Sequence, residues 1–143
     1  MVVLPGTHLL PKEPELALSA LTDEQFILVP RHLEPGYYDL CISLFQQAGF
    51  SPKVVQKASQ KQTILGLVSA GMGVSLAFAS IRNICRAGVV YMNLSTPVSK
   101  VNLAAVWRQD ETSTVLQAFL EAVREIVQSA NIGAVAPRLI ANS

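Results

Sequence analysis

The apolar residues between positions 53 and 78 follow two different spacings. Ile64, Leu65, Leu67 and Val68 recur at three and four positions, which predicts one apolar face of a helix. The segments 53–58 and 74–78 on either side of this helix predict short strands. A strand, a helix and a strand joined by short connections form a parallel unit, and we expect its crossover to be right-handed.

The ends of this helix have their own signals. Ser59 is followed three residues later by Gln62, which is the pattern of a capping box and predicts a helix start near Gln60. Gly71 stands where the helix must end, and glycine tolerates the positive φ that a helix C-terminus often needs.

A second unit of the same kind precedes the first. Residues 26–29 predict a buried strand, and residues 37–48 predict a helix that ends at Gly49. The apolar positions of that helix are Leu40, Cys41, Leu44, Phe45 and Ala48. Both units share the strand at residues 53–58, so the pattern predicts an α/β fold with a mostly parallel sheet flanked by helices.

The remaining elements are shorter, except for the last helix. We expect strands at residues 1–4, 88–93 and 101–107, a single helical turn at 18–21, a short helix at 79–86 and a tail at 130–143. Residues 112–128 predict the longest helix, with one continuous apolar stripe made of Val115, Leu116, Phe119, Leu120, Val123, Ile126 and Val127. Because so much apolar surface is costly to leave in water, we expect this helix to pack against a second copy or to fold back onto its own sheet.

Composition excludes several classes of protein. The chain has 143 residues, of which 50% are apolar, and a formal net charge of +1. This indicates one domain with a real core and no strong field for nucleic acid. Cys41 and Cys85 make no disulfide framework, and no cysteine spacing suits zinc. No apolar run is long enough to span a membrane, and the first residues do not resemble a signal peptide.

Catalysis finds little support in the motifs. The segment Gly71-Met72-Gly73 follows a helix and precedes a strand, which is the wrong order for a phosphate-binding loop. The chain has neither a nucleophile elbow nor a P-loop, and its carboxylates are isolated. We therefore expect no catalytic residue, no metal and no cofactor.

A ligand site is better supported than an active site. In an open parallel sheet, ligands bind beyond the carboxyl ends of the strands, where helix N-termini present unpaired N–H groups. The segments 31–38, 59–63 and 78–80 supply three such points, with Arg31, Gln62 and Thr63 as candidate contacts and Lys61 as a further cation. Their sum favours an anion such as a carboxylate. Alternatively, Arg31 is a solvated loop cation, and Gln62 and Thr63 only cap a helix.

Three motifs in order resemble the effector-binding domain of LysR-type transcriptional regulators. The first is FILV from Phe26 followed by LFQQAGFSPKV from Leu44. The second is TILGLVSAGMGVSLA from Thr63, and the third is AAVWR from Ala104 followed by LQAFL from Leu116. Together they cover most of residues 4–127. The resemblance is nearest to the branch that controls aromatic-compound catabolism.

This resemblance implies a periplasmic-binding-protein-like (type 2) fold with an effector in the cleft between two α/β subdomains. Residues 5–100 would be subdomain II, residues 1–4 and 101–107 the hinge strands, residues 108–129 the last helix of subdomain I and residues 130–143 a tail. It also implies that the first part of subdomain I and the DNA-binding domain are missing from this chain.

The resemblance further implies a non-enzymatic, cytoplasmic sensor of a small, anionic effector, acting as a homo-oligomer (dimer or tetramer) and reaching DNA only through the missing domain. Family contacts fall on Pro35, Gly36 and Tyr37. Two alternatives stay open: a solute-binding protein of a transporter with the same fold, and an enzyme of flavodoxin-like topology.

Overall fold

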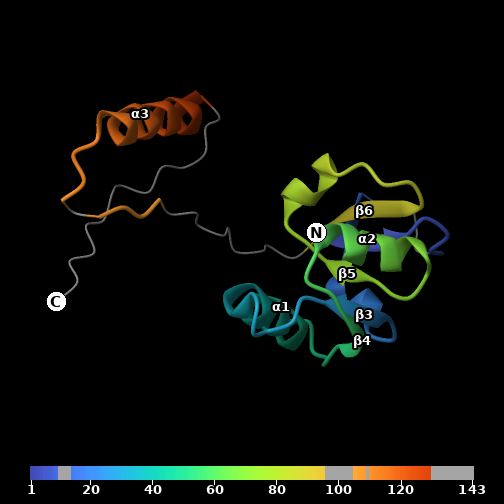
Figure 1. Ribbon diagram of the computed structural model, residues 1–143. Coiled ribbons are helices and arrows are strands. Elements are labelled where there is room, and N and C mark those ends of the chain that lie inside the picture. The colour runs from blue at the N-terminus through green and yellow to red at the C-terminus, as the bar shows by residue number, and fades with distance from the viewer. Residues whose placement is uncertain (10–13, 96–104, 109, 130–143) are drawn as a thin grey trace. The chain divides into compact units, whose positions relative to one another are not determined.

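The computed structural model describes residues 1–9, 14–95, 105–108 and 110–129 (Figure 1). The chain divides into two compact units, Met1–Lys100 and Val101–Ser143. The strands of the first unit are β1 (Val2–Pro5), β2 (Glu15–Leu16), β3 (Gln25–Leu28), β4 (Lys53–Lys57), β5 (Ser75–Leu76) and β6 (Val89–Leu94). Its helices are α1 (Pro35–Gln47) and α2 (Lys61–Ser69), with short 3₁₀ helices η1 (Leu18–Leu21) and η2 (Ala79–Asn83).

The strands form a four-stranded sheet in the order β2, β6, β1 and β5 and a two-stranded sheet of β3 and β4. β3 pairs with β4 in parallel, and a parallel bridge joins Phe26 of β3 to Val74 just before β5. β1 runs antiparallel to both β5 and β6, whereas β2 and β6 are parallel. The predicted parallel units are therefore confirmed, but β3 lies between the two strands that α2 connects. The handedness of that crossover stays a prediction.

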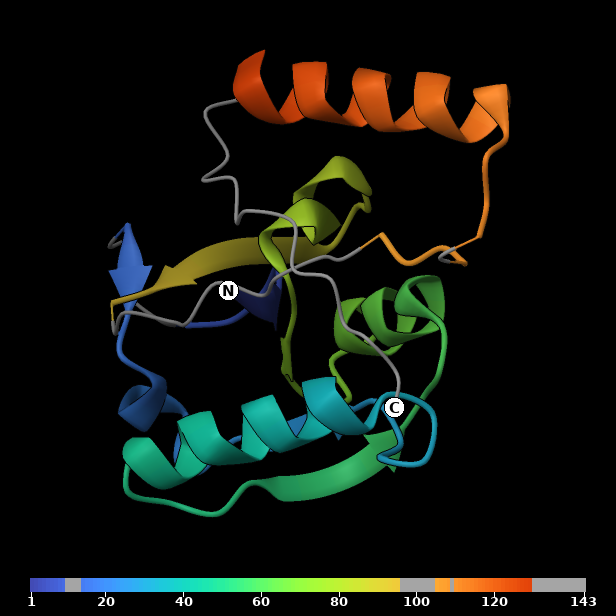
Figure 2. The same cartoon turned by 90° about the vertical axis from the view of Figure 1, so that its left-hand side faces the viewer.

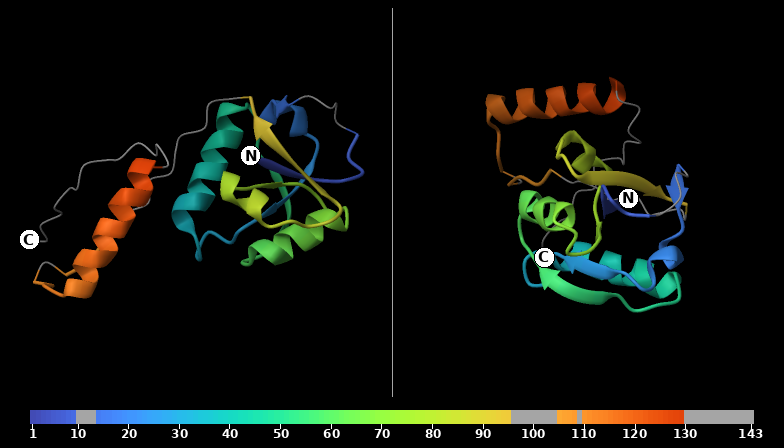
Figure 3. Two further views of the ribbon diagram at one scale, coloured as in Figure 1. Left: turned by 90° about the horizontal axis from the view of Figure 1, so that it is seen from above. Right: turned by 90° about the vertical axis from the view of Figure 1, so that its right-hand side faces the viewer.

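Helices α1 and α2 cover opposite faces of these strands (Figure 2, Figure 3). Side chains alternate between faces along a strand. Val2, Leu4, Phe26 and Leu28 accordingly join the core cluster that contains Cys41 and Phe45 of α1. The other core cluster lies on the α2 side of the strands. It consists of Val3, Ile27, Val29, Ile64, Leu65, Val68 and Ile81. A sheet buried on both faces explains the nearly continuous apolar runs in β1 and β3.

The predicted helix ends are partly confirmed. Gly49 after α1 and Gly71 after α2 have φ values of 87° and 76°, as a glycine-terminated helix requires. The predicted capping box is wrong. Gln60 is the N-cap of α2 and makes no side-chain capping hydrogen bond, so Ser59 lies one residue too early to cap the helix.

Several expected boundaries are also corrected. α1 begins at Pro35, two residues before the expected start, because proline suits the first turn of a helix. The strand expected at 74–78 is only Ser75–Leu76, and the short helix expected at 79–86 is a 3₁₀ helix that ends at Asn83. The single turn at Leu18–Leu21 is confirmed as η1.

The second glycine of the Gly71-Met72-Gly73 motif does not end the helix but permits a close backbone approach. Gly73 has a φ of +153°, and a Cβ placed there would lie 2.5 Å from the carbonyl oxygen of Gln25. That same oxygen accepts a hydrogen bond of 2.8 Å from the N–H of Val74, and the carbonyl of Val74 accepts one of 2.9 Å from Ile27. Gly73 therefore allows the backbone before β5 to approach β3 and complete the parallel pairing.

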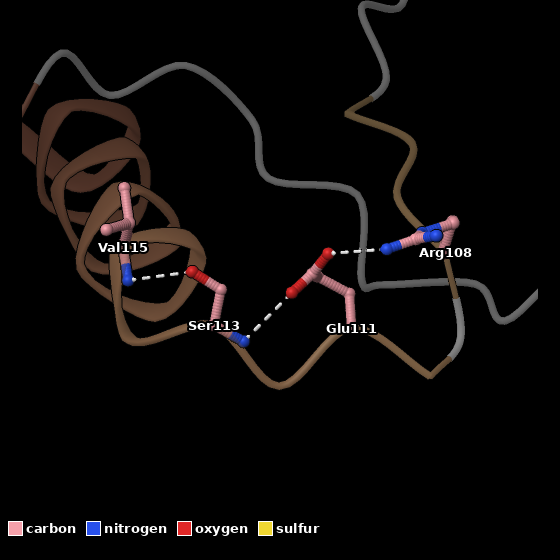
Figure 4. A network of polar contacts seen from close by, with 4 residues as sticks. All are labelled: Arg108, Glu111, Ser113 and Val115. Atoms are coloured by element: carbon pink, nitrogen blue, oxygen red, sulfur yellow. Dashed lines mark hydrogen bonds and ion pairs between the residues drawn. The ribbon is translucent and has the colours of Figure 1, made fainter.

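The second unit contains α3 (Thr114–Ser129). Ser113 caps this helix: its Oγ accepts a hydrogen bond of 3.2 Å from the N–H of Val115 (Figure 4). The Ser113 N–H donates to the Glu111 carboxylate, which also pairs with Arg108 at 3.2 Å. This cap explains why the helix begins two residues after the expected start at residue 112.

One side of the α3 stripe is exposed. Val115, Phe119 and Ile126 are 77%, 55% and 62% exposed, whereas Leu120 is buried. The hinge strand expected at 101–107 lies outside the described residues at positions 101–104, and residues 105–108 are not in a strand. The expected tail at 130–143 also lies outside the described residues.

Candidate functional site

The three predicted ligand-binding points meet at one hollow of the first unit. The N-cap and first turn of α1 contribute Glu34 and Tyr37, and the start of α2 contributes Ser59 and Lys61. The N-cap and first turn of η2 contribute Phe78 and Ser80, and each of the three segments follows the carboxyl end of a strand. Because β3, β4 and β5 run in the same direction, those ends lie at one edge of the sheet. The predicted convergence is therefore confirmed.

The walls of this hollow are mostly apolar. The rings of Tyr37 and Phe78 lie 4.6 Å apart at one side. The other apolar lining residues are Val3, Val29, Ile64, Leu65, Leu76, Ala77 and Ile81. The enclosed part is about 30 Å³, which accommodates a few water molecules at most. Ligand pockets usually enclose about 300 to 1,000 Å³, so these walls hold only part of a ligand.

Tyr37 connects the hollow to the core. Its hydroxyl donates a hydrogen bond of 2.6 Å to the carbonyl oxygen of Leu76, at the end of β5. Burial raises the pKa of Tyr37, and burial likewise raises the pKa of the Cys41 thiol to about 11. Both groups are therefore neutral in the folded protein well above neutral pH.

This burial predicts a loss of stability in alkaline solution. The Cys41 pKa is about 11 in the folded state against a usual value of 9.0, so the unfolded chain loses its thiol proton first as the pH rises. The contribution of this thiol to the free energy of unfolding is fully present below about pH 9. It falls by roughly 2 kcal/mol between about pH 9 and 11. Urea unfolding at pH 8, 9 and 10 measures this fall in the free energy of unfolding. In a Cys41→Ala variant the fall should be smaller, and an equal fall in both proteins would contradict the prediction.

The other predicted site residues lie elsewhere. The Arg31 guanidinium forms two hydrogen bonds, of 2.8 and 3.0 Å, to the Asp39 carboxylate, which hold the pKa of Asp39 below its usual value. Arg31 and Pro35 line a second hollow, which is larger, at about 660 Å³, and more open to solvent, together with Pro30, His32 and Lys57. Gln62 and Thr63 are exposed and line neither hollow, and neither does Gly36.

Of the predicted site residues, only Tyr37 therefore lies in the apolar hollow. Glu34, Ser59 and Ser80 were not predicted as contacts, although their positions next to the three helix starts were a signal that could have found them. Lys61 was noted only as a further cation. Arg31 was judged from its charge, and its partner Asp39 lies eight residues away on α1.

The described residues show no basis for a metal centre. Within residues 1–9, 14–95, 105–108 and 110–129, no three acidic, histidine or cysteine side chains gather as metal ligands. No helix in these ranges has the length and apolar character needed to cross a membrane. Both cysteines are free thiols: Cys41 is buried and Cys85 is exposed.

Sequence comparison relates the chain to transcriptional regulators. The family model described as "LysR substrate binding domain" matches residues 1–128. The HTH-type transcriptional regulator IlvR of Caulobacter vibrioides is 42% identical over 114 residues, which are 79% of this chain and 38% of that protein. The regulator CatR of Pseudomonas putida is 36% identical over 127 residues, or 87% of this chain and 43% of CatR. The chain thus spans about two fifths of the length of these relatives.

Solved structures agree with this relation. The effector-binding domain of BenM with its effector benzoate has a TM-score of 0.73 and 25% identity, covering 99% of this chain and 65% of that one. The effector-binding domain of QuiR in complex with shikimate has a TM-score of 0.68 at 20% identity, covering 90% and 60%, and supports the fold alone.

Proposed function

The chain belongs to the LysR substrate-binding-domain family, and from this premise we propose that it senses a small effector and transmits its binding to a DNA-binding domain outside this chain. The fold is that of the type 2 periplasmic-binding-protein-like effector domains. The observation that carries the proposal is the hollow at which the starts of α1, α2 and η2 meet. The named relatives are transcriptional regulators, which favours this function over solute transport and over an enzyme.

The hollow would be one wall of the effector cleft. Its enclosed volume of about 30 Å³ leaves a ligand largely uncovered. We infer that residues 5–100 act as subdomain II, that residues 108–129 belong with subdomain I, and that a second wall completes the site in the whole regulator. Closure of two walls on a ligand would shift the population of hinge conformations, which is how binding would reach DNA.

Within this wall, the observed lining favours Tyr37 as an effector contact, with Glu34, Lys61 and Ser80 beside it. We propose a ligand that carries a carboxylate, because Lys61, a cation at the N-terminus of α2, lines the hollow. Arg31 is a weaker candidate, since its guanidinium is already paired with Asp39.

We also infer a cytoplasmic homo-oligomer. A transcriptional regulator must be in the same compartment as the DNA that it controls. The exposed side chains of α3 (Val115, Phe119 and Ile126) form an apolar strip that a second copy would bury. Sedimentation velocity at micromolar concentration tests this inference, and a purely monomeric chain would contradict it.

Obstructing the hollow tests the proposed function. Ser80 is exposed at the rim of the hollow, so Ser80→Trp should fill it without disturbing the core. Benzoate, shikimate, L-leucine and L-phenylalanine, titrated at millimolar concentrations into the ¹⁵N-labelled chain, should include a ligand that shifts the amides of Ser59, Lys61 and Ser80. We expect Ser80→Trp to weaken that binding by at least about tenfold.

The matched control is Ser51→Trp, which places the same ring on an exposed serine that lines neither hollow. This variant should bind like the unmodified chain. Equal binding by Ser80→Trp would place the ligand elsewhere, and no response to any probe would count against the sensory function.

A further inference from the structure

One acidic and one basic residue, both exposed, line the apolar hollow. Glu34 lies at the start of α1, and Lys61 is the first residue of α2. Neither forms an ion pair with another residue in the described part of the chain, where Arg31 pairs with Asp39 and Arg108 with Glu111. The hollow therefore offers both charges to a ligand.

Neither residue is needed there to stabilise its helix. Lys61 places a positive charge at the positive end of the α2 dipole, where an acidic side chain would be favourable instead. Glu34 is the N-cap of α1, but its carboxylate makes no capping hydrogen bond. A residue that opposes a local stability rule at the rim of a pocket is expected where function requires it.

A ligand of a single charge fits this arrangement poorly. A simple carboxylate would be attracted by Lys61 and the α2 N–H groups but would meet the negative charge of Glu34, and a simple amine would meet the reverse. We propose that the hollow binds a zwitterion: an α-amino acid whose carboxylate lies at Lys61 and whose ammonium lies at Glu34. This inference rests on the proposed function and names the class of its effector.

The walls define the rest of the ligand. Besides the two charged residues, the lining is aliphatic, with Ile64, Leu65 and Ile81 from α2 and η2, and aromatic, with Tyr37 and Phe78. Such walls favour an aliphatic or aromatic side chain over a polar one, because apolar contact releases water from both surfaces. The class is therefore the apolar amino acids, such as leucine or phenylalanine.

A series of matched ligands tests the proposal on the full chain. L-Leucine is compared with 4-methylpentanoate, which lacks the ammonium group, and with 3-methylbutylamine, which lacks the carboxylate. Shifts of the Ser59, Lys61 and Ser80 amides in ¹⁵N-labelled protein report binding to this hollow. We expect leucine to bind at least about tenfold more tightly than either analogue, since each analogue leaves one charged side chain without its partner.

Two variants assign the two charges. Glu34→Gln should abolish the preference for leucine over 4-methylpentanoate, and Lys61→Gln should abolish the preference over 3-methylbutylamine. Glu121→Gln and Lys53→Gln make the same changes at exposed positions that line neither hollow, and both should retain the preferences. Circular dichroism of all four proteins confirms that each is folded.

The outcomes separate this inference from the proposed function. If 4-methylpentanoate or benzoate binds the hollow as well as leucine does, and Glu34→Gln strengthens that binding, the site takes a simple anion. The zwitterion proposal then fails while the sensory function stands. If none of these probes shifts the hollow amides, both fail together.

Discussion

Replacing Gly73 with alanine is expected to lower the free energy of unfolding by about 3 to 5 kcal/mol. The new Cβ would lie 2.5 Å from the carbonyl oxygen of Gln25, and this neighbour is backbone that cannot move aside alone. The residue would also hold an L side chain at a φ of +153°. The clash falls on the hydrogen bonds that join Val74 to β3, so β5 and the hollow wall beyond it should loosen. Urea unfolding of the purified variant measures the loss.

Gly71→Ala is the matched control for this change. Gly71 also has a positive φ, of +76°, but beyond its own chain neighbours no atom lies within 4 Å of a Cβ placed there. It should therefore lose only about 1 to 2 kcal/mol, the usual cost of an L residue in the left-handed region. Equal losses in the two variants would mean that close approach to β3 is not what requires glycine at position 73.

Replacing Phe45 with alanine is expected to lower the free energy of unfolding by about 3 to 5 kcal/mol. The Phe45 side chain is fully buried, and its ring centroid lies 4.7 Å from that of Phe26 and 5.4 Å from that of Phe50, both in edge-to-face arrangements. Truncation would remove these contacts and leave a cavity between α1 and β3. The same urea titration measures the effect.

Phe119→Ala is the control for the truncation of Phe45. It makes the identical change on α3, where the side chain is 55% exposed, so the loss should stay below about 1 kcal/mol. Both variants are compared at low protein concentration, where association of copies contributes least. A loss at Phe45 no larger than that at Phe119 would contradict the assignment of Phe45 to the core.

Local elements could be predicted because their signals lie within a few residues. The helical spacing of Ile64, Leu65 and Val68 and the terminating glycines Gly49 and Gly71 each depend on near neighbours. The capping box failed for a related reason. Its spacing is correct, but the backbone enters α2 at Gln60, one residue later than Ser59, and a local pattern does not decide which residue is the N-cap.

The candidate site could be predicted as a place but not as a set of side chains. The rule that ligands lie beyond the carboxyl ends of parallel strands indicated three segments, and residues of all three line one hollow. The directions of the side chains could not be predicted in this way. Arg31 forms its ion pair with Asp39 and lines another hollow, and Gln62 and Thr63 are exposed and line neither, whereas Glu34 and Lys61 line the apolar one.

The amino-acid sequence by itself determined the α/β class, the order of the helices and most strands, and the family, because periodicity and motif order are properties of neighbouring positions. Only the tertiary structure decided that β3 lies between β4 and β5, that β1 is antiparallel to its neighbours, and that Glu34 and Lys61 line one hollow. The physical reason is that strand pairing and side-chain direction depend on packing between segments far apart in the chain, which no local pattern encodes.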